Sequence, residues 1–367
     1  MPRLIFFFSF IFLISVNECT AQKKVPKIIS GHVKDIETGL PVGSVNVFLS
    51  NTTIGTSTDS NGMYKIIDIP SGIYDLVISR VGYEREIKTV DMIISDSLYY
   101  EIKLTTKLIQ TSEFEITANQ PAEWKENLDW FKKIFIGESK FAKECTLQNS
   151  EVINFKIFND TLIARTDSIL YIRNKAFGYQ MCIILKEFVW NIKEDYGHYL
   201  IYTYFIPMKA VNVKEQTKWI KNREEAYAGS FNHFLFSLLH NSIEKDMFSI
   251  YSGPLDKLVN RSGHRVNPED FDIKPIEGTP LLSLYFDGYI LVEYGKKADN
   301  EFIRGGEDNR GLPVGGILRV DLSSASFISM KSLCAYIDSL GNVFNPLAFE
   351  VAGRWAYKRV AELVPMY

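Results

Sequence analysis

The sequence predicts a mainly β protein in two parts, an N-terminal seven-stranded β-sandwich and a longer α+β domain dominated by antiparallel sheet. Apolar and polar residues alternate in short runs over residues 26–118, and turn residues interrupt these runs roughly every 8–12 positions. Longer alternating runs follow between residues 151 and 205. Helical spacing of apolar residues is confined to a few segments of residues 119–367, which we expect to form the second domain.

Residues 1–21 are expected to form a secretory signal peptide. Arg3 supplies a positive charge, Leu4–Val16 is a continuous apolar run, and Cys19-Thr20-Ala21 offers small residues before a cleavage site. A retained membrane anchor is the alternative. We therefore expect an exported protein that is periplasmic or associated with the outer membrane or cell surface.

The composition excludes several classes of protein. The formal net charge is −3, and no run of lysine and arginine is present, which argues against nucleic-acid binding. No apolar run after the leader approaches the ~20 residues of a transmembrane helix. Three cysteines remain after the leader, namely Cys145, Cys182 and Cys334. Buried free thiols are expected, with one disulfide between Cys145 and Cys182 as the alternative.

The first domain contains strand-like runs separated by turn residues. Asp59-Ser-Asn-Gly62 and Pro70-Ser-Gly72 are typical of tight reversals, because Asn and Gly tolerate positive φ and Pro presets a turn. No helical period interrupts the runs. The expected strands are Ile28–Val33, Ser44–Leu49, Met63–Ile69, Tyr74–Ser79, Glu86–Val90, Ser97–Leu104 and Leu108–Ala118.

Five motifs in this run resemble the carboxypeptidase-like regulatory domain, a transthyretin-like β-sandwich. They are Gly31-His-Val33, Thr38-Gly-Leu-Pro41, Gly55–Tyr64, Pro70–Leu76 and Gly82-Tyr83. The resemblance implies a module without chemistry of its own, since catalysis in the metallo-carboxypeptidases belongs to a separate zinc domain. Similar modules also precede outer-membrane nutrient receptors, but the residues that remain here are too few for the barrel that follows in those receptors.

The second region mixes helices with long strands. Apolar residues at helical spacing predict a helix over Trp124–Phe135 that ends at Gly137, and similar patterns predict helices over Arg223–His240 and Phe349–Leu363. An antiparallel meander is expected in between, with Asn159-Asp160 as a two-residue turn. The expected strands are Glu151–Phe158, Thr161–Arg165, Gly178–Trp190, His198–Phe205, Met247–Tyr251, Leu282–Tyr294, Gly316–Asp321 and Ala335–Asp338, the last paired with Val343-Phe344.

Motifs spread over this region also resemble the C-terminal part of a family of exported bacterial proteins in which the same sandwich comes first. They include Phe135-Ile-Gly137, Asn222-Arg223, Ala228-Gly229-Ser230 and Gly353-Arg-Trp355. This resemblance implies neither an activity nor any site residues.

No catalytic motif is visible, and no metal or cofactor is expected. None of the five histidines has Glu three residues later, and the spacing of zinc carboxypeptidases and of His-Glu-x-x-His is absent. Ser230 and His233 share a helix face, but Ser230 is better explained as a helix N-cap. Arg304–Gly316 is rich in glycine but lacks the Lys-Ser/Thr of a phosphate-binding loop.

Two sets of residues are candidate sites. Trp219, Arg223, Tyr227 and His233 combine aromatic residues with arginine, which is the composition of binding hot spots, although helix capping and core packing explain them equally well. Four Asp-Ser/Thr-aliphatic sequences resemble sites of bacterial O-glycosylation. The hydroxyl residues concerned are Ser97, Thr161, Ser168 and Ser339.

Two functions fit these observations. The first is a non-enzymatic envelope protein whose sandwich docks or spaces and whose α+β domain recognises a partner protein or a glycan. The alternative is a peptide or glycan hydrolase with its site in the α+β domain. The hydrolase requires acid, base or metal ligands that converge in one pocket, for example Glu187, Glu293 or Asp287.

Overall fold

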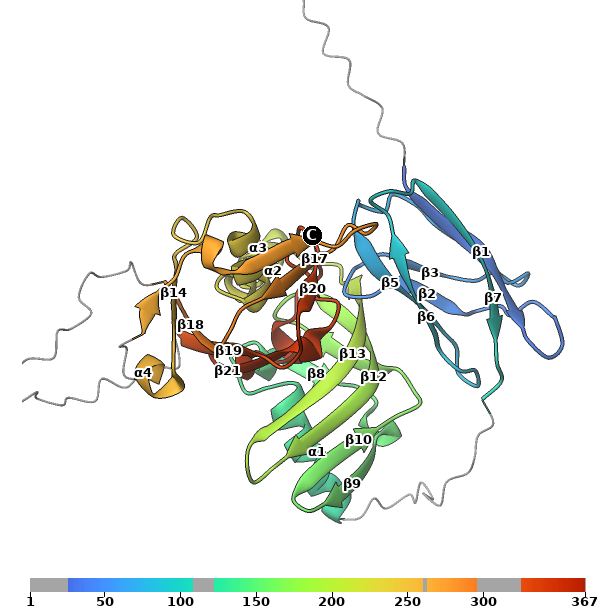
Figure 1. The fold of residues 1–367 in the computed structure, drawn as a ribbon. Helices are drawn as coiled ribbons and strands as arrows, with labels where there is room; N and C mark the ends of the chain where they lie inside the picture. Colours follow the sequence, from blue (N-terminus) through green and yellow to red (C-terminus); the bar gives the residue numbers. More distant parts are fainter. Residues whose placement is uncertain (1–25, 108–121, 260–262, 296–324, 367) are drawn as a thin grey trace, which may run out of the picture.

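The computed structural model describes residues 26–107, 122–259, 263–295 and 325–366. Figure 1 shows the N-terminal sandwich in blue, a central sheet in green, and two further sheets in orange and red. The expected signal peptide, the strand over Leu108–Ala118, the strand over Gly316–Asp321 and the loop Arg304–Gly316 lie outside the described residues. None of the helices in the described ranges has the length and apolar character of a bilayer-spanning helix.

The N-terminal part is a β-sandwich, as the sequence predicts. One sheet has the order β4-β1-β7 and the other β3-β2-β5-β6, and β1 pairs with β7 in parallel. Inward-facing residues such as Ile29, Val47 and Leu76 are fully buried between the sheets. The strands are β1 (Ile28–Asp35), β2 (Asn46–Leu49), β3 (Gly55–Ser57), β4 (Met63–Ile66), β5 (Ile73–Ser79), β6 (Glu86–Asp91) and β7 (Ser97–Leu104).

A six-stranded antiparallel sheet forms the centre of the molecule. In it β12 pairs with β13 on one side and with β11 and β10 on the other, and the Asn159-Asp160 turn joins β9 to β10 as expected, with φ values of 47° and 58°. The strands are β8 (Cys145–Leu147), β9 (Asn154–Phe158), β10 (Thr161–Arg165), β11 (Leu170–Asn174), β12 (Tyr179–Asn191) and β13 (Tyr196–Pro207), and short 3-10 helices η1 (Ala142–Glu144) and η2 (Ser150–Val152) precede β8 and β9.

Helix α1 (Ala122–Phe135) covers one face of this sheet. Phe131 and Phe135 are fully buried, and the ring of Phe188 on β12 lies 4.9 Å from Phe131 and 6.2 Å from Phe135. A β-bulge between Leu185 and Glu187 shifts the alternation of β12 by one residue. Because of this shift Ile183 and Leu185 before the bulge, and Phe188 after it, all contribute to the core beneath α1.

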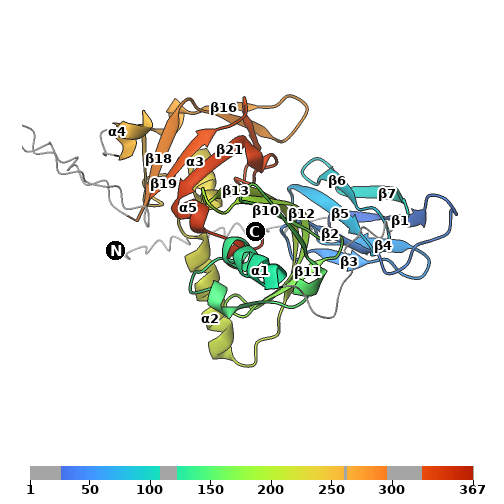
Figure 2. The same ribbon diagram turned by 90° about the horizontal axis from the view of Figure 1, so that it is seen from below.

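The sandwich packs against the opposite face of the central sheet (Figure 2). Phe48 and Val77 form a buried cluster with Ile184, which points away from α1. The β2–β3 turn also bonds to the edge of β13: the Asn51 amide donates to the Thr203 carbonyl at 2.6 Å, and the Phe205 amide donates to the Thr52 carbonyl at 2.9 Å. The sandwich is therefore held by apolar packing and by backbone hydrogen bonds.

A second core lies beyond the central sheet. Helix α3 packs on a five-stranded sheet of order β15-β14-β18-β19-β21, with a three-stranded sheet β16-β17-β20 beside it. The strands are β14 (Phe248–Gly253), β15 (His264–Arg265), β16 (Asp272–Pro275), β17 (Leu282–Tyr285), β18 (Tyr289–Tyr294), β19 (Ala325–Met330), β20 (Ala335–Ile337) and β21 (Phe349–Gly353). The helices are α2 (Val213–Tyr227), α3 (Phe231–Leu239), α4 (Leu255–Val259), α5 (Arg354–Tyr357), η3 (Pro268–Asp270), η4 (Pro346–Ala348) and η5 (Val360–Glu362).

Three sequence predictions in this part are wrong. The helix expected over Arg223–His240 is two helices, because Gly229 takes a φ of 65° between α2 and α3. The strand expected over Leu282–Tyr294 is divided at Gly288, and its halves β17 and β18 belong to different sheets. The helix expected over Phe349–Leu363 begins as strand β21, which pairs with β19.

The three cysteines in the described ranges are free thiols, so the alternative disulfide between Cys145 and Cys182 is absent. Burial raises the pKa of the Cys145 thiol to about 12 and that of Cys182 to about 11. Both thiols therefore stay protonated and unreactive near neutral pH.

Candidate functional site

Trp219 and Arg223 anchor helix α2 to the turn between β11 and β12. The Trp219 indole donates to the Lys175 carbonyl at 2.9 Å, and the Arg223 Nε donates to the Phe177 carbonyl at 2.8 Å. Trp219 is buried, and the Arg223 guanidinium lies 4.1 Å from the centre of the Tyr179 ring. These contacts give both side chains a structural role, and neither of them lines the pocket described below.

Tyr227 and His233 lie together at the junction of α2 and α3, with ring centres 4.9 Å apart. The His233 Nδ1 accepts a hydrogen bond from the Gly229 amide at 3.0 Å, and burial lowers the pKa of His233. The Ser230 hydroxyl accepts from the His233 amide at 3.1 Å, which makes it the N-cap of α3. Ser230 and His233 therefore bond to the backbone rather than forming a nucleophile and base.

The carboxylates considered for a hydrolase do not converge. Glu187 is exposed on β12, where an oxygen lies 3.4 Å from the His198 Nε2. Glu293 is buried on β18 in a different sheet, and Asp287 is exposed in the turn before that strand. Within the described ranges, no group of three or more His, Cys, Asp or Glu residues is placed to hold a metal ion.

The four predicted glycosylation residues occupy different surroundings. Ser97 at the start of β7 and Ser339 in the turn after β20 are exposed. Thr161 and Ser168 are half-buried beside β10. The two exposed hydroxyls are therefore the more accessible to a transferase.

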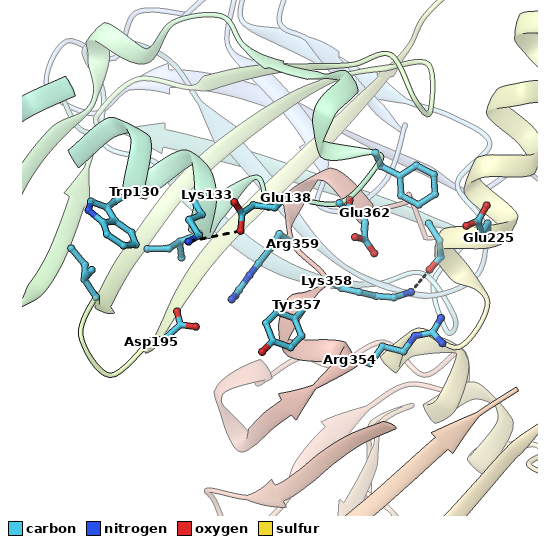
Figure 3. Close-up of a pocket in the computed structure, with 16 residues that line it drawn as sticks. Trp130, Lys133, Glu138, Asp195, Glu225, Arg354, Tyr357, Lys358, Arg359 and Glu362 are labelled. Carbon is cyan, nitrogen blue, oxygen red and sulfur yellow. Dashed lines mark hydrogen bonds and ion pairs between the residues drawn. The ribbon is translucent and has the colours of Figure 1, made fainter. Parts of the chain in front are cut away.

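A pocket with a volume of about 720 Å³ lies where the two cores of the C-terminal region meet. Its walls come from α1 and the loop after it, the β12–β13 turn, the end of α2, and the segment Arg354–Glu362, and we call it the junction pocket (Figure 3). A volume of this size is typical of ligand sites. Its charged and large aromatic side chains come from residues far apart in the sequence.

Backbone hydrogen bonds hold the Arg354–Glu362 segment in place. The Ala361 amide donates to the Ile136 carbonyl at 3.2 Å, and the buried Asn174 amide group donates to the Ala361 carbonyl at 3.0 Å. The segment continues to Met366, whose amide donates to the Asn51 carbonyl of the sandwich at 2.8 Å. One wall of the junction pocket is thus tied to α1, to the central sheet and to the sandwich.

The charges of the junction pocket are of two kinds. Lys133 lies 3.9 Å from a Glu138 oxygen, and Lys140 outside the pocket pairs with Glu225. Arg354 and Lys358 instead bond to backbone carbonyls, from the Arg354 Nη2 to Ala228 at 3.2 Å and from the Lys358 Nζ to Ala226 at 2.6 Å.

Aromatic side chains lie in the same pocket, as Trp130 and Tyr357 do, or contact its cations from outside, as Trp190 does. The Arg359 guanidinium lies 4.6 Å from the centre of the Trp190 ring, and Trp130 lies beneath the Lys133 ammonium at 5.3 Å. Tyr357 is 65% exposed, and Figure 3 shows it between Asp195 and Arg354. An exposed aromatic ring beside unpaired charges is a common element of recognition sites.

The residues of the junction pocket were not found by sequence reasoning. The available signal was Arg354-Trp-Ala-Tyr-Lys-Arg359, which has three cations within six residues. In the structure all three cations of this run line the junction pocket.

Comparison with known protein families identifies the N-terminal part. Residues 29–116 match the family described as the CarboxypepD_reg-like domain, and the C-terminal region matches no family model. A TonB-dependent receptor of Formosa agariphila is 38% identical over 72 residues, which are 20% of this chain and 6% of the receptor. The chain therefore spans a small fraction of this curated relative.

Solved structures give weaker matches. A cohesin–X-dockerin complex of Acetivibrio cellulolyticus has a chain with 17% identity, and the match covers 30% of this chain and 74% of that one with a TM-score of 0.20. A structure described as a putative carbohydrate binding protein of Bacteroides uniformis is 11% identical, with coverages of 49% and 79% and a TM-score of 0.19. Scores of this size do not establish a shared fold.

Proposed function

Because residues 29–116 match the CarboxypepD_reg-like domain family, we propose that this chain is a non-catalytic protein of the bacterial cell envelope. Its C-terminal region binds a glycan or a partner protein, and the junction pocket is the binding site. The observation that carries this proposal is the pocket itself, which combines about 720 Å³ of space with unpaired cations and an exposed tyrosine.

The sandwich in this proposal is a fixed support. Its Phe48 face is covered by the central sheet, and its β2–β3 turn bonds to β13 and to Met366. Outside the sandwich, no sheet or helix of the described ranges is seen to pack on the opposite sheet, β4-β1-β7, and we propose that this sheet faces the envelope. The sandwich would therefore fix the orientation of the junction pocket relative to the envelope component that contacts β4-β1-β7.

The three carboxylates considered for a hydrolase do not form a site together. Glu187, Glu293 and Asp287 lie on separate elements, and none of them lines the junction pocket. General acid–base catalysis needs two groups within reach of one substrate bond. We expect no turnover of peptides or oligosaccharides by the purified protein.

A binding panel tests the proposal. Neutral and acidic oligosaccharides and short peptides are titrated calorimetrically into the wild-type protein and into Tyr357→Ala. We expect at least one ligand to bind, with affinity at least fivefold lower in Tyr357→Ala. Tyr99→Ala is the matched control, because Tyr99 is 61% exposed on β7 of the sandwich, away from the pocket. Binding that is unchanged in Tyr357→Ala, or hydrolysis of a ligand, would contradict the proposal.

Export and modification are two further parts of the proposal. We expect N-terminal sequencing of the native protein to begin at Gln22, after the leader has been removed. We also expect the intact mass of native material to exceed that of the mature chain by one or more sugar units, carried first at Ser97 and Ser339. An unmodified mass would remove the glycosylation hypothesis.

A further inference from the structure

Arg354 and Lys358 form a pair of like charges on one wall of the junction pocket. They lie four residues apart, at the start of α5 and at its C-cap. Their polar contacts are to the carbonyls of Ala228 and Ala226, and the Arg354 guanidinium also lies 5.1 Å from the centre of the Tyr294 ring. Among the described residues, no carboxylate lies within ion-pair distance of either cation.

The surroundings of Lys358 are unfavourable to its positive charge. Burial, together with the nearby Arg354, lowers its pKa to about 8, while Glu362 and Glu225 oppose this shift only in part. Glu225 is already paired with Lys140. A partly buried cation without a bonded carboxylate destabilises the fold, so a negative group supplied by a ligand would offset an unfavourable interaction that the protein alone leaves in place.

Two carboxylates that line the same pocket are acceptors. The carboxylates of Asp195 and Glu362 have no ion pair among the described residues, although the Trp190 indole donates to Asp195 at 3.2 Å. Carboxylates accept hydrogen bonds and cannot donate them at neutral pH. A ligand that suits these four side chains needs one anionic group for Arg354 and Lys358, and hydroxyl donors for Asp195 and Glu362.

We propose that the junction pocket binds an acidic sugar, whose carboxylate lies between Arg354 and Lys358 and whose hydroxyls donate to Asp195 and Glu362. This inference rests on the proposed binding function of the same pocket and names its ligand class. The exposed ring of Tyr357 supplies an apolar surface for the face of the sugar ring. About 720 Å³ is enough for two or three sugar units.

The first experiment compares one sugar with and without its charge. Trigalacturonate and its fully methyl-esterified form are titrated calorimetrically into the wild-type protein at pH 7. We expect the acid to bind at least tenfold more tightly than the ester, because the ester has the same hydroxyls but no anion. Equal affinities would overturn the acidic-sugar inference and leave the proposed function intact.

Proton uptake provides a second readout. A bound carboxylate raises the pKa of Lys358, so binding above pH 8 takes up a proton. At pH 8.5 the heat of trigalacturonate binding should then differ between phosphate and Tris buffers by an amount that follows the ionisation enthalpy of the buffer. A heat that is independent of the buffer would contradict the role of Lys358.

Variants of Lys358 distinguish the effect of its charge on binding from any effect on folding. Lys358→Met should weaken trigalacturonate binding at least tenfold, whereas Lys358→Arg should stay within about threefold of wild type. Lys34→Met is the matched control, since Lys34 is bonded to Glu101 on the sandwich. Circular dichroism and thermal melts verify that each variant is folded. If Lys358→Met binds like wild type, the inference fails.

A peptide arm distinguishes the other source of a carboxylate. Trialanine and trialanine amide differ only at the C-terminal group, and neither carries sugar hydroxyls. We expect both to bind at least tenfold more weakly than trigalacturonate. Tight binding of trialanine together with no binding of trigalacturonate would overturn the acidic sugar in favour of a peptide C-terminus. If no member of the sugar and peptide panel binds, the proposed function fails with it.

Discussion

The sandwich and the junction pocket differ in how much of their structure local sequence patterns describe. In the sandwich, short turns such as Asp59–Gly62 join strands that follow one another, and the core is made by alternation along each strand. The junction pocket instead joins α1, the β12–β13 turn, the end of α2 and Arg354–Glu362. Local patterns therefore describe the sandwich well, while the pocket exists only after distant segments have packed.

The contact between the sandwich and the central sheet gives the largest expected effect. Phe48 is 2% exposed and stacks on Tyr204 at 5.2 Å, so Phe48→Ala removes the main apolar contact of the sandwich with the central sheet. We expect a loss of about 3 kcal/mol in the free energy of unfolding, measured by urea denaturation. Limited proteolysis should also release the sandwich as a fragment.

Tyr99→Ala is the control for this comparison, because Tyr99 is exposed on the sheet β4-β1-β7 of the sandwich. It should change the free energy of unfolding by less than about 0.5 kcal/mol. If Phe48→Ala behaves like Tyr99→Ala, the sandwich is not held in the way described.

Gly39 and Gly229 have similar backbone angles but different surroundings. Comparing them separates the cost of backbone strain from the cost of a clash with a distant side chain. Gly229 has a φ of 65°, and a Cβ there would lie 2.4 Å from the Tyr294 ring, whereas Gly39 has a φ of 69° and a Cβ there would have no heavy atom within 4 Å. We expect Gly39→Ala to cost about 1 kcal/mol, from backbone strain alone. Gly229→Ala should cost about 3 kcal/mol because the clash is added to the same strain. Equal losses in urea denaturation would contradict this division.

The smallest expected effect concerns Lys358 and is a gain in stability. Its folded pKa of about 8 is below the ordinary value of 10.5, so the unfolded chain binds more protons between these pH values, and the free energy of unfolding rises with pH across this window. Below pH 8 the charge of the half-buried Lys358 side chain lowers the free energy of unfolding by its full amount. Lys358→Met removes this unfavourable charge, and we expect about 1 kcal/mol of added stability at pH 7 after the loss of the bond to the Ala226 carbonyl.

The measurement is urea denaturation of wild type and Lys358→Met at several pH values from 7 to 10. The gain should shrink as the pH rises above 8, because wild-type Lys358 then becomes neutral. A variant that is less stable than wild type at pH 7 would show that Lys358 serves the fold rather than a ligand. A gain in stability together with a loss of binding is the pattern expected of a binding residue.

Much of the fold was predictable because its signals are local. The Asn159-Asp160 turn, the N-cap at Ser230 and the end of α1 before Gly137 all follow from the conformational preferences of a few adjacent residues. Predictions failed where neighbours in space decide. Gly229 and Gly288 interrupt apolar runs that look continuous, and Phe349–Gly353 becomes a strand because β19 offers an edge to pair with.

The candidate site shows the same limit. Trp219 and Arg223 have the composition of a binding surface, yet both bond to carbonyls of the β11–β12 turn, and nothing in the sequence indicates which carbonyls lie near. Arg354, Lys358 and Arg359 were visible only as a short basic run. Their availability for a ligand depends on whether nearby carboxylates are already paired with other cations, as Glu225 is with Lys140. This pairing is established only when the segments pack.

Local sequence patterns were enough to define the sandwich, the meander and the helix over Trp124–Phe135, because alternation, turn residues and helical spacing act between residues that are close along the chain. Tertiary packing was needed to place Arg354 and Lys358 away from any carboxylate partner in the described ranges and to select the face of the sandwich that is covered. The physical reason is that burial and pairing of charges are properties of the space around a side chain, which distant segments create together.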